Sequence, residues 1–256
     1  MPTSPIALTS ADYVTAVQGL IAHITDTQGE AIGRAADIIA ASLADGGVLQ
    51  AFGSGHSEAA SMELVGRAGG LIATNRIALR DIVLFGGEPA EVLADPKSER
   101  DPALARRIYD LVKAQPKDVF VITSQSGGNG SIVEMAHIAK AEGHPVVAIT
   151  SLAHTAGITS RHHSGRKLLE LADVVIDNGA PHGDSVLPLP DGGSVCAVSS
   201  IGNALIAQLL TAETVIRLLD RGIRPDVYLS ANIAGGDVSN DDAEARYAGR
   251  IRRSAS

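Results

Sequence analysis

Short runs of aliphatic residues alternate with stretches of helical periodicity along most of this 256-residue sequence. The clearest run is 119–123 (Val-Phe-Val-Ile-Thr); apolar residues at helical spacing follow it over 131–142, before the next run at 146–150. Continuous apolar runs of this length are typical of strands buried on both faces, as in a parallel sheet covered by helices. The alternation therefore predicts an α/β fold, a three-layer doubly wound parallel sheet.

The remaining elements are assigned by the same patterns. Residues 1–10 are predicted to form a flexible arm, and 11–43 a helical N-terminal extension of one long helix or two shorter ones interrupted near Gly29. No long linker or internal repeat divides residues 11–256, so we expect a single domain. Strands are also predicted at 48–52, 71–74, 82–85 and 174–177, and helices at 57–68, 101–113, 197–219 and 241–251.

The composition excludes several classes of function. With 21 Lys and Arg against 29 Asp and Glu, the formal net charge is −8, which argues against a nucleic-acid partner. A single cysteine, Cys196, excludes a disulfide framework and a multi-cysteine zinc site. The sequence shows no secretory signal and no apolar run near the roughly 20 residues that span a membrane. We therefore expect a soluble, cytoplasmic protein with no membrane partner.

Two loops rich in glycine and hydroxyl side chains follow two of the predicted strands. Residues 53–58 read Gly-Ser-Gly-His-Ser-Glu, and 124–131 read Ser-Gln-Ser-Gly-Gly-Asn-Gly-Ser. Loops after parallel strands meet at the carboxyl edge of the sheet, where ligands bind. Glycines allow close backbone approach, and the N–H groups of a helix N-terminus attract a phosphate. The candidate binding residues are Ser54, Gly55, Ser57, Ser124, Gln125, Ser126, Gly127 and Asn129.

Other nucleotide and metal motifs fit less well. The first loop carries Gly53 and Gly55 after a strand, but Glu58 stands where a dinucleotide fingerprint has its third glycine. A nicotinamide site is thus a weak alternative, and the loop is not a P-loop because no Gly-Lys-Ser/Thr follows. His154, His162 and His163 lack the spacing of a ligand set, and we assign the pair at 162 and 163 to an exposed, mobile loop. We expect no metal and no cofactor.

Several motifs resemble those of the sugar isomerase (SIS) family. Residues 121–127 (Val-Ile-Thr-Ser-Gln-Ser-Gly) resemble its phosphosugar signature, and 53–57 occupy the place of its first glycine-rich loop. Residues 63–67 (Glu-Leu-Val-Gly-Arg) are similar to a stretch of the phosphoheptose isomerases in which the glutamate is catalytic. Residues 178–184 and 229–232 resemble segments of a subgroup of single-domain bacterial SIS proteins. This subgroup is related to the phosphoheptose isomerases and to the N-acetylmuramic acid 6-phosphate etherases. The likeness runs from about residue 11 to 252.

The resemblance implies a five-stranded parallel sheet, a phosphosugar ligand and a homodimer or homotetramer with the site at the subunit interface. Two departures leave the reaction open. Asn129 stands where many members carry threonine, and the predicted helix 197–219 lacks the histidine that phosphoheptose isomerases carry in their last helix.

A sugar 6-phosphate in its open-chain form has an acidic proton on C2, and a carboxylate base within reach removes it. Return of the proton to C1 makes an aldose–ketose isomerase. On an N-acetylhexosamine 6-phosphate, the same carbanion expels the C3 substituent, which makes a lyase. Glu63, which the resemblance singles out, is the candidate base; the alternative is a solvated glutamate paired with Arg67 at i+4.

Two histidines are candidate acid–base partners for Glu63, although each could be an ordinary polar loop residue. His56 lies inside the first loop, and His182 follows the last core strand in a segment rich in glycine and proline. Glu213 is either a second acid or a structural carboxylate. Two functions from different classes stay open: an enzyme acting on a sugar phosphate, and a phosphosugar sensor that needs no Glu63.

Overall fold

The computed structural model describes residues 8–95 and 97–252. Its centre is a five-stranded parallel sheet in the order β2-β1-β3-β4-β5, which confirms the predicted fold class. The paired strands are in close register, with Leu49 opposite both Thr74 and Val119. The strands are β1 (Leu49–Gly53), β2 (Thr74–Ile77), β3 (Val119–Thr123), β4 (Val146–Thr150) and β5 (Val174–Asp177).

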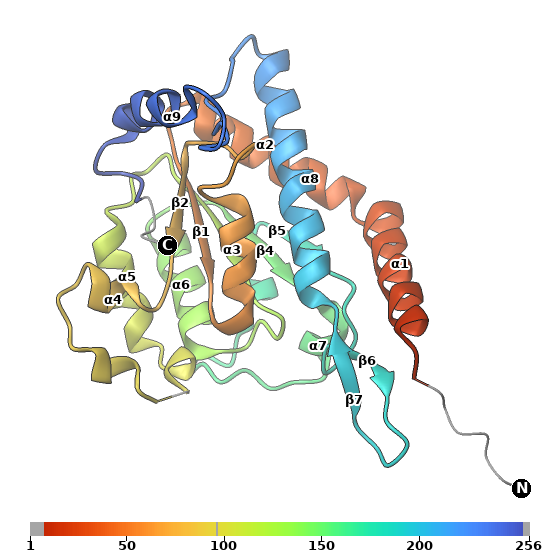
Figure 1. Cartoon of the computed structure of the whole chain (residues 1–256). Helices are drawn as coiled ribbons and strands as arrows, with labels where there is room; N and C mark the ends of the chain where they lie inside the picture. Colours follow the sequence, from red (N-terminus) through yellow and green to blue (C-terminus); the bar gives the residue numbers. More distant parts are fainter. Residues whose placement is uncertain (1–7, 96, 253–256) are drawn as a thin grey trace, which may run out of the picture.

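Helices cover both faces of the sheet (Figure 1). On one face, α4, α5 and α6 enclose a core that includes Phe52, Phe120 and Ile122. On the other face, α1, α2, α3 and α8 enclose a core that includes Ala51 and Val121. The bounds are α1 (Ser10–Thr27), α2 (Gly29–Ala44), α3 (Glu58–Leu64), α4 (Asp81–Leu84), α5 (Ala103–Val112), α6 (Gly130–Ala141) and α8 (Ser199–Asp220).

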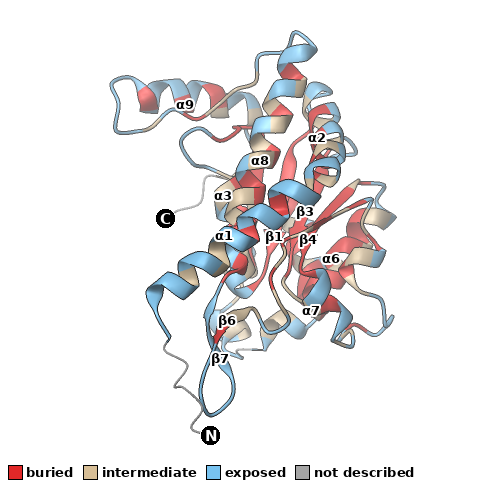
Figure 2. Cartoon of the chain, turned by 90° about the vertical axis from the view of Figure 1, so that its right-hand side faces the viewer, coloured by how far each residue is buried: buried red, intermediate tan, exposed pale blue. Residues whose placement is uncertain are grey.

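Neighbouring residues of β1 and β3 thus point to opposite faces of the sheet. Because both faces are buried under helices, every position of these strands favours an apolar residue, which explains the continuous apolar runs of the sequence. Figure 2 shows the strands as the buried interior, with exposed residues along the outer surfaces of the helices. Each buried aliphatic or phenyl side chain contributes about 1.5–3 kcal/mol to folding, and an aliphatic core compensates for the scarcity of aromatic residues.

Smaller elements connect and extend the three layers. A two-stranded antiparallel hairpin, β6 (Ser185–Pro188) with β7 (Ser194–Ala197), projects beyond the sheet between β5 and α8 (Figure 1). The other short elements are η1 (Gly55–Ser57), η2 (Ala90–Leu93), η3 (Ser98–Arg100), α7 (Leu152–Ala156), η4 (Leu168–Glu170), α9 (Gly236–Glu244) and η5 (Ala245–Tyr247).

Some sequence predictions of these elements were wrong or displaced. Residues 82–85 form no strand but the turn of α4, because the Asp81 carboxylate accepts the N–H of Ala78 and a helical hydrogen bond joins Phe85 to Asp81. The strand predicted at 71–74 begins only at Thr74, and the last helix begins at Gly236 rather than 241. Of the predicted arm 1–10, residues 1–7 lie outside the described residues, while the hydroxyl of Thr9 caps α1.

Candidate functional site

The two glycine-rich loops meet where the direction of the sheet's connections reverses. β1 and β3 are neighbours, yet α3, which follows β1, packs on the face of α8, whereas α6, which follows β3, packs on the opposite face. Loops that leave adjacent strands toward opposite faces open a crevice at the carboxyl edge, and open α/β sheets bind ligands there. Both predicted binding loops therefore leave the sheet at the position where this topology favours a ligand crevice, here called the β1–β3 crevice.

The first loop needs its glycines. A Cβ at Gly53 would collide with the carbonyl group of Ser57, and Gly55 has a φ of +56°, which favours glycine. The loop then makes the single turn of η1 and enters α3. This path leaves Ser54 buried, with its hydroxyl hydrogen-bonded to Glu99.

The second loop is shaped by its own serines. Ser124 Oγ accepts the N–H of Gly127 at 3.1 Å, and Ser126 Oγ accepts the N–H of Gly128 at 3.4 Å. Each hydroxyl used as an acceptor keeps one proton to donate. Gln125 Oε1 accepts the Asn178 amide at 2.9 Å, while its buried Nε2 has no hydrogen-bond partner among the described residues. The two serine hydroxyls thus keep protons that suit an anionic ligand, and the Gln125 amide has a further, buried donor.

Glu99, which the sequence analysis did not consider, links the two loops. The Ser54 hydroxyl donates to Glu99 Oε2 at 3.0 Å, and the Asn129 amide donates to Oε1 at 2.8 Å. The Ser131 hydroxyl donates to the backbone carbonyl of Glu99 at 2.7 Å. Glu99 belongs to η3, a three-residue turn between α4 and α5. Nothing in the local sequence marks it, because its partners lie 30 to 45 residues away.

A second residue missed from the sequence is Arg161. Its guanidinium donates to Asn129 Oδ1 at 2.9 Å, and its backbone N–H donates to the carbonyl of Gly128 at 2.8 Å. Asn129 therefore stands between a cation and a carboxylate, accepting from Arg161 and donating to Glu99. This chain of polar contacts places a positive charge beside the second loop, where an anion would benefit from it.

A cavity of about 400 Å³ opens beside the first loop. Its lining includes Ser54, Gly55 and Glu99, together with Glu58 and Arg80, which lie 2.8 Å apart as an ion pair. Glu58 thus makes a salt bridge from the first turn of α3, consistent with the helix-start role of a carboxylate there. The volume is that of a small-molecule site.

Glu63 lies on α3 but is turned toward α8. Its carboxylate contacts the Arg67 guanidinium and accepts the Gln208 amide at 3.1 Å. The described residues that line the 400 Å³ cavity do not include it. Glu213 on α8 likewise pairs with Arg217, at 2.5 Å. Both contacts are i+4 ion pairs, within α8 for Glu213 and just beyond the end of α3 for Glu63.

Neither candidate histidine is among the described residues that line the 400 Å³ cavity. His56 is exposed on η1, and Ser57 is half-buried beside it. His182 is exposed beyond β5, and its ring stacks on that of His154 at a centroid distance of 4.8 Å. Burial, and then the charge of His182, hold the pKa of His154 below its ordinary value. These two rings belong to the carboxyl edge of β4 and β5 rather than to the β1–β3 crevice.

The interpretation of His162 as part of an exposed loop was wrong. Its ring is buried, with Nε2 at 2.7 Å from Glu134 Oε2 and Nδ1 at 2.8 Å from Ser164 Oγ, because the loop folds back on α6. Only His163 of the pair is exposed. Within the described residues, no three His, Cys, Asp or Glu side chains are arranged to hold a metal ion.

Comparison with known proteins identifies the family. Residues 12–151, which include β1, β3 and both loops, match the family described as SIS domain. A UPF0309 protein of Listeria monocytogenes is 37% identical over 236 residues, covering 91% of this chain and 94% of the relative. A UPF0309 protein of Streptomyces avermitilis is 37% identical over 240 residues, covering 93% and 95%. The chain belongs to the UPF0309 family of SIS-domain proteins.

Solved structures of the same fold come from phosphoheptose isomerases. That of Neisseria gonorrhoeae has a TM-score of 0.52 at 18% identity, covering 79% of this chain and 94% of its own. That of Francisella tularensis has a TM-score of 0.51 at 16% identity, covering 81% and 98%. At these identities the similarity extends to the fold of this SIS-domain protein. In the parts of the chain that the structure describes, no helix is long and apolar enough to cross a membrane.

Proposed function

We propose that this SIS-domain protein binds a sugar 6-phosphate in the β1–β3 crevice and removes the proton from C2 of its open-chain form. One observation carries the binding step: Ser54 of the first loop and Asn129 of the second donate to the two oxygens of a single carboxylate. The two donors are therefore close enough to bind the same oxyanion. Donors that hold carboxylate oxygens also suit the oxygens of a phosphate.

The phosphate would take its remaining hydrogen bonds from the second loop. Ser124, Ser126 and the unpartnered Nε2 of Gln125 have protons to donate, and Gly127, with a φ of +63°, provides the turn that holds them together. The N-terminus of α6 and the guanidinium of Arg161 add positive charge at the same end. The phosphoheptose isomerases that share the fold support a phosphosugar as the ligand class.

Glu63 is our candidate for the base. Abstraction of the C2 proton leaves an enediolate, and return of that proton to C1 converts an aldose to a ketose. On an N-acetylhexosamine 6-phosphate, the electron pair left on C2 instead forms a double bond to C3 as the C3 substituent leaves. His56 and His182 are the candidates for the acid that protonates an oxygen. We infer a homodimer or homotetramer with the site at the subunit interface, so that a neighbouring subunit could supply such an acid. The proposed reaction takes place in the cytoplasm.

A phosphosugar sensor is the second candidate, and the position of Glu63 favours it. The carboxylate is held by Arg67 and Gln208, outside the described lining of the cavity. A binding module keeps the oxyanion loops and needs no base.

Proton NMR in deuterated water separates the two functions. Hexose, heptose and N-acetylhexosamine 6-phosphates are incubated with the protein, and loss of the C2 proton signal marks abstraction. A ketose product then identifies an isomerase, and an unsaturated sugar a lyase. We expect Glu63→Gln to slow exchange by about 10²- to 10⁴-fold with little change in affinity, as for loss of a general base.

Ser126→Ala is the matched binding variant. We expect its affinity for the same sugar phosphate to fall about tenfold, while any exchange at saturation continues. Binding without exchange at any sugar would make the protein a sensor, and full exchange by Glu63→Gln would remove Glu63 from the reaction. If no sugar phosphate and no inorganic phosphate bind, the proposed function is wrong.

A further inference from the structure

The carboxylate of Glu99 occupies the position that the proposed function gives to a ligand anion. Each of its oxygens takes one donor, from Ser54 and from Asn129, so both loops are satisfied without a ligand. A Cβ added to Gly55 would lie 3.2 Å from Glu99 Oε2, which shows that the carboxylate also covers the open face of that glycine. We propose that Glu99 is an internal competitor of the ligand's phosphate. The inference rests on the proposed function and adds a determinant of its affinity and selectivity.

The backbone beneath Glu99 is anchored, so only its side chain has to move. The Ser131 hydroxyl donates to the carbonyl of Glu99 at 2.7 Å. The carbonyl of Arg100 packs so closely on Gly130 that a Cβ there would collide with it. Both anchors belong to the start of α6, next to the second loop. Rotation of the Glu99 side chain into the adjoining 400 Å³ cavity would free Ser54 and Asn129.

No counter-charge holds Glu99 in place. It makes no ion pair with any described residue, since Arg80 is paired with Glu58 and Arg161 donates to Asn129. Its hold on the loops is two hydrogen bonds from neutral donors. A phosphate dianion can accept the same hydrogen bonds and has the stronger attraction to Arg161 and to the N-terminus of α6.

Competition of this kind lowers the apparent affinity for every anion. A phosphate and a carboxylate cannot share the two donors, because like charges a few ångströms apart repel strongly. The ligand binds only the molecules whose Glu99 has rotated away, so its apparent Kd equals the intrinsic Kd divided by the fraction of such molecules. Glu99 thereby favours dianionic phosphates over sugar acids. A sugar acid carries a single charge, as Glu99 does, so replacing Glu99 by it gains less electrostatic free energy.

Calorimetric titration of the full chain with inorganic phosphate and with sugar 6-phosphates tests the proposal. Glu99→Ala removes the competitor, and Glu99→Gln removes its charge and leaves one acceptor oxygen where the carboxylate had two. We expect both variants to bind phosphate about tenfold more tightly than the wild type. Glu91→Gln is the matched control, because it removes the same charge from an exposed position in the same connection; its affinity should be that of the wild type.

The outcomes separate this inference from the proposed function. The inference alone is overturned if the wild type binds phosphate and both Glu99 variants bind it no more tightly, with unchanged thermal midpoints. Binding by the variants that is tenfold weaker would make Glu99 a ligand-binding residue. Equal tightening in Glu91→Gln also overturns it, since net charge then explains the gain. If neither the wild type nor any variant binds phosphate or sugar phosphate, both proposals fail together.

Discussion

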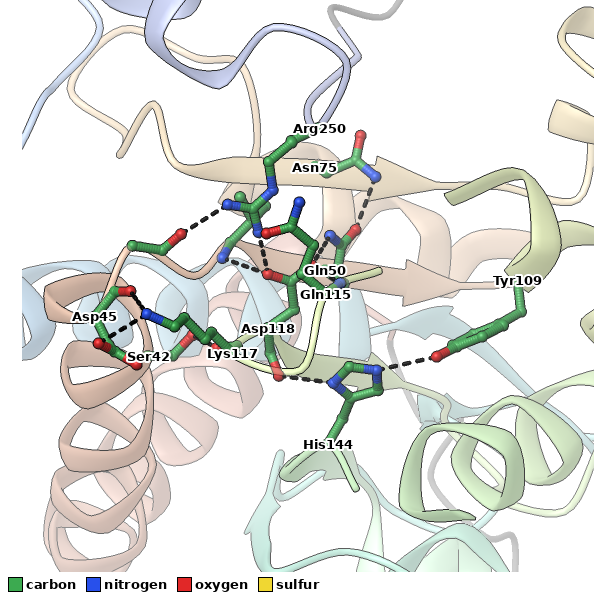
Figure 3. A network of polar contacts seen from close by, with 12 residues as sticks. Ser42, Asp45, Gln50, Asn75, Tyr109, Gln115, Lys117, Asp118, His144 and Arg250 are labelled. Carbon is green, nitrogen blue, oxygen red and sulfur yellow. Dashed lines mark hydrogen bonds and ion pairs between the residues drawn. The ribbon is translucent and has the colours of Figure 1, made fainter. Parts of the chain in front are cut away.

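The two edges of the sheet satisfy their polar groups in different ways. At the amino edge, the buried Asp118 carboxylate accepts the N–H of Val48, the N–H of Gln115 and the Gln50 amide at 2.9–3.0 Å, and it pairs with Arg250 (Figure 3). Figure 3 shows these partners closing around Asp118 from several segments of the chain. All are fixed parts of the fold, and such a network rigidifies the structure.

At the carboxyl edge, the corresponding carboxylate is Glu99, and its partners are two loop side chains. It has no described cation and borders a 400 Å³ cavity. A buried carboxylate such as Asp118, at the centre of a hydrogen-bond network, stabilises the fold. A carboxylate such as Glu99, held by two neutral donors beside a cavity, can be replaced by a ligand anion. The comparison predicts that loss of the Asp118 carboxylate changes the free energy of unfolding, whereas loss of the Glu99 carboxylate changes binding.

Asp118→Ala should have the largest effect on stability. The variant leaves the buried donors of Val48 and Gln50, and the N–H of Gln115, without their acceptor and Arg250 without its partner. Removing one member of a buried charged network costs about 3–5 kcal/mol, so we expect a loss of that size in urea unfolding.

Asp45→Ala provides the control at the same edge. Asp45 pairs with Lys117 at 3.0 Å, but both side chains are largely exposed, so the loss should be about 0.5 kcal/mol. Equal losses in the two variants, or a loss below about 1 kcal/mol for Asp118→Ala, would contradict the distinction between the edges.

Gly130→Ala should have the next largest effect. Alanine in a helix is ordinarily the better residue, but here its Cβ would collide with the Arg100 carbonyl and lie 3.0 Å from Pro102 Cδ. Overpacking of this kind costs about 1–3 kcal/mol, and it would also displace Glu99 from the second loop. Gly19→Ala is the matched comparison, because nothing lies within 4 Å of a Cβ there on exposed α1. It should stabilise the protein by about 0.5–1 kcal/mol. The same sign in both thermal unfolding experiments would refute the steric argument.

Much of this fold is predictable because buried parallel strands leave a strong pattern. β3 and β4 stand out as continuous aliphatic runs, and the loops after β1 and β3 fall at one edge by topology alone. Residues 82–85 show the limit, since periodicity cannot separate a four-residue apolar run from a helical turn. The hairpin β6–β7 had a usable signal, the turn sequence Pro-Asp-Gly-Gly at 190–193, which was not recognised.

The candidate site is less predictable for a physical reason. Ser54 and Asn129 sit in loops whose composition marks them, but Glu99 and Arg161 reach the loops only through tertiary packing. Neither belongs to a periodic element or a motif. A long-range contact between irregular segments leaves no local trace in one sequence, so the residues that close the crevice were found only from the structure.

The smallest expected effect is a pH dependence that arises at the carboxyl edge. Burial, with the charge of His182, lowers the pKa of His154 below its ordinary 6.5, while Asp184 opposes this and Arg161 adds to it. The unfolded chain therefore binds a proton at His154 more readily than the folded protein does. Stability is lost as the pH falls below about 6.5, and no more is lost below the folded pKa. His154→Gln should shrink the difference in urea midpoint between pH 7.5 and 5.5.

His182→Gln should shrink the same difference less, since it removes the repulsion and leaves the burial, which is the larger cause. At the amino edge, His144 has both ring nitrogens engaged, by the Tyr109 hydroxyl at 3.0 Å and the Asp118 carbonyl at 3.1 Å. His144→Gln should therefore lower the midpoint at pH 7.5 itself. His154→Gln should lower it less, because the ring of His154 makes one exposed hydrogen bond, from the N–H of Gly183 to Nδ1 at 3.0 Å. If His154→Gln retains the full pH difference, a group other than His154 causes it, and the assignment of this difference to the carboxyl edge is wrong.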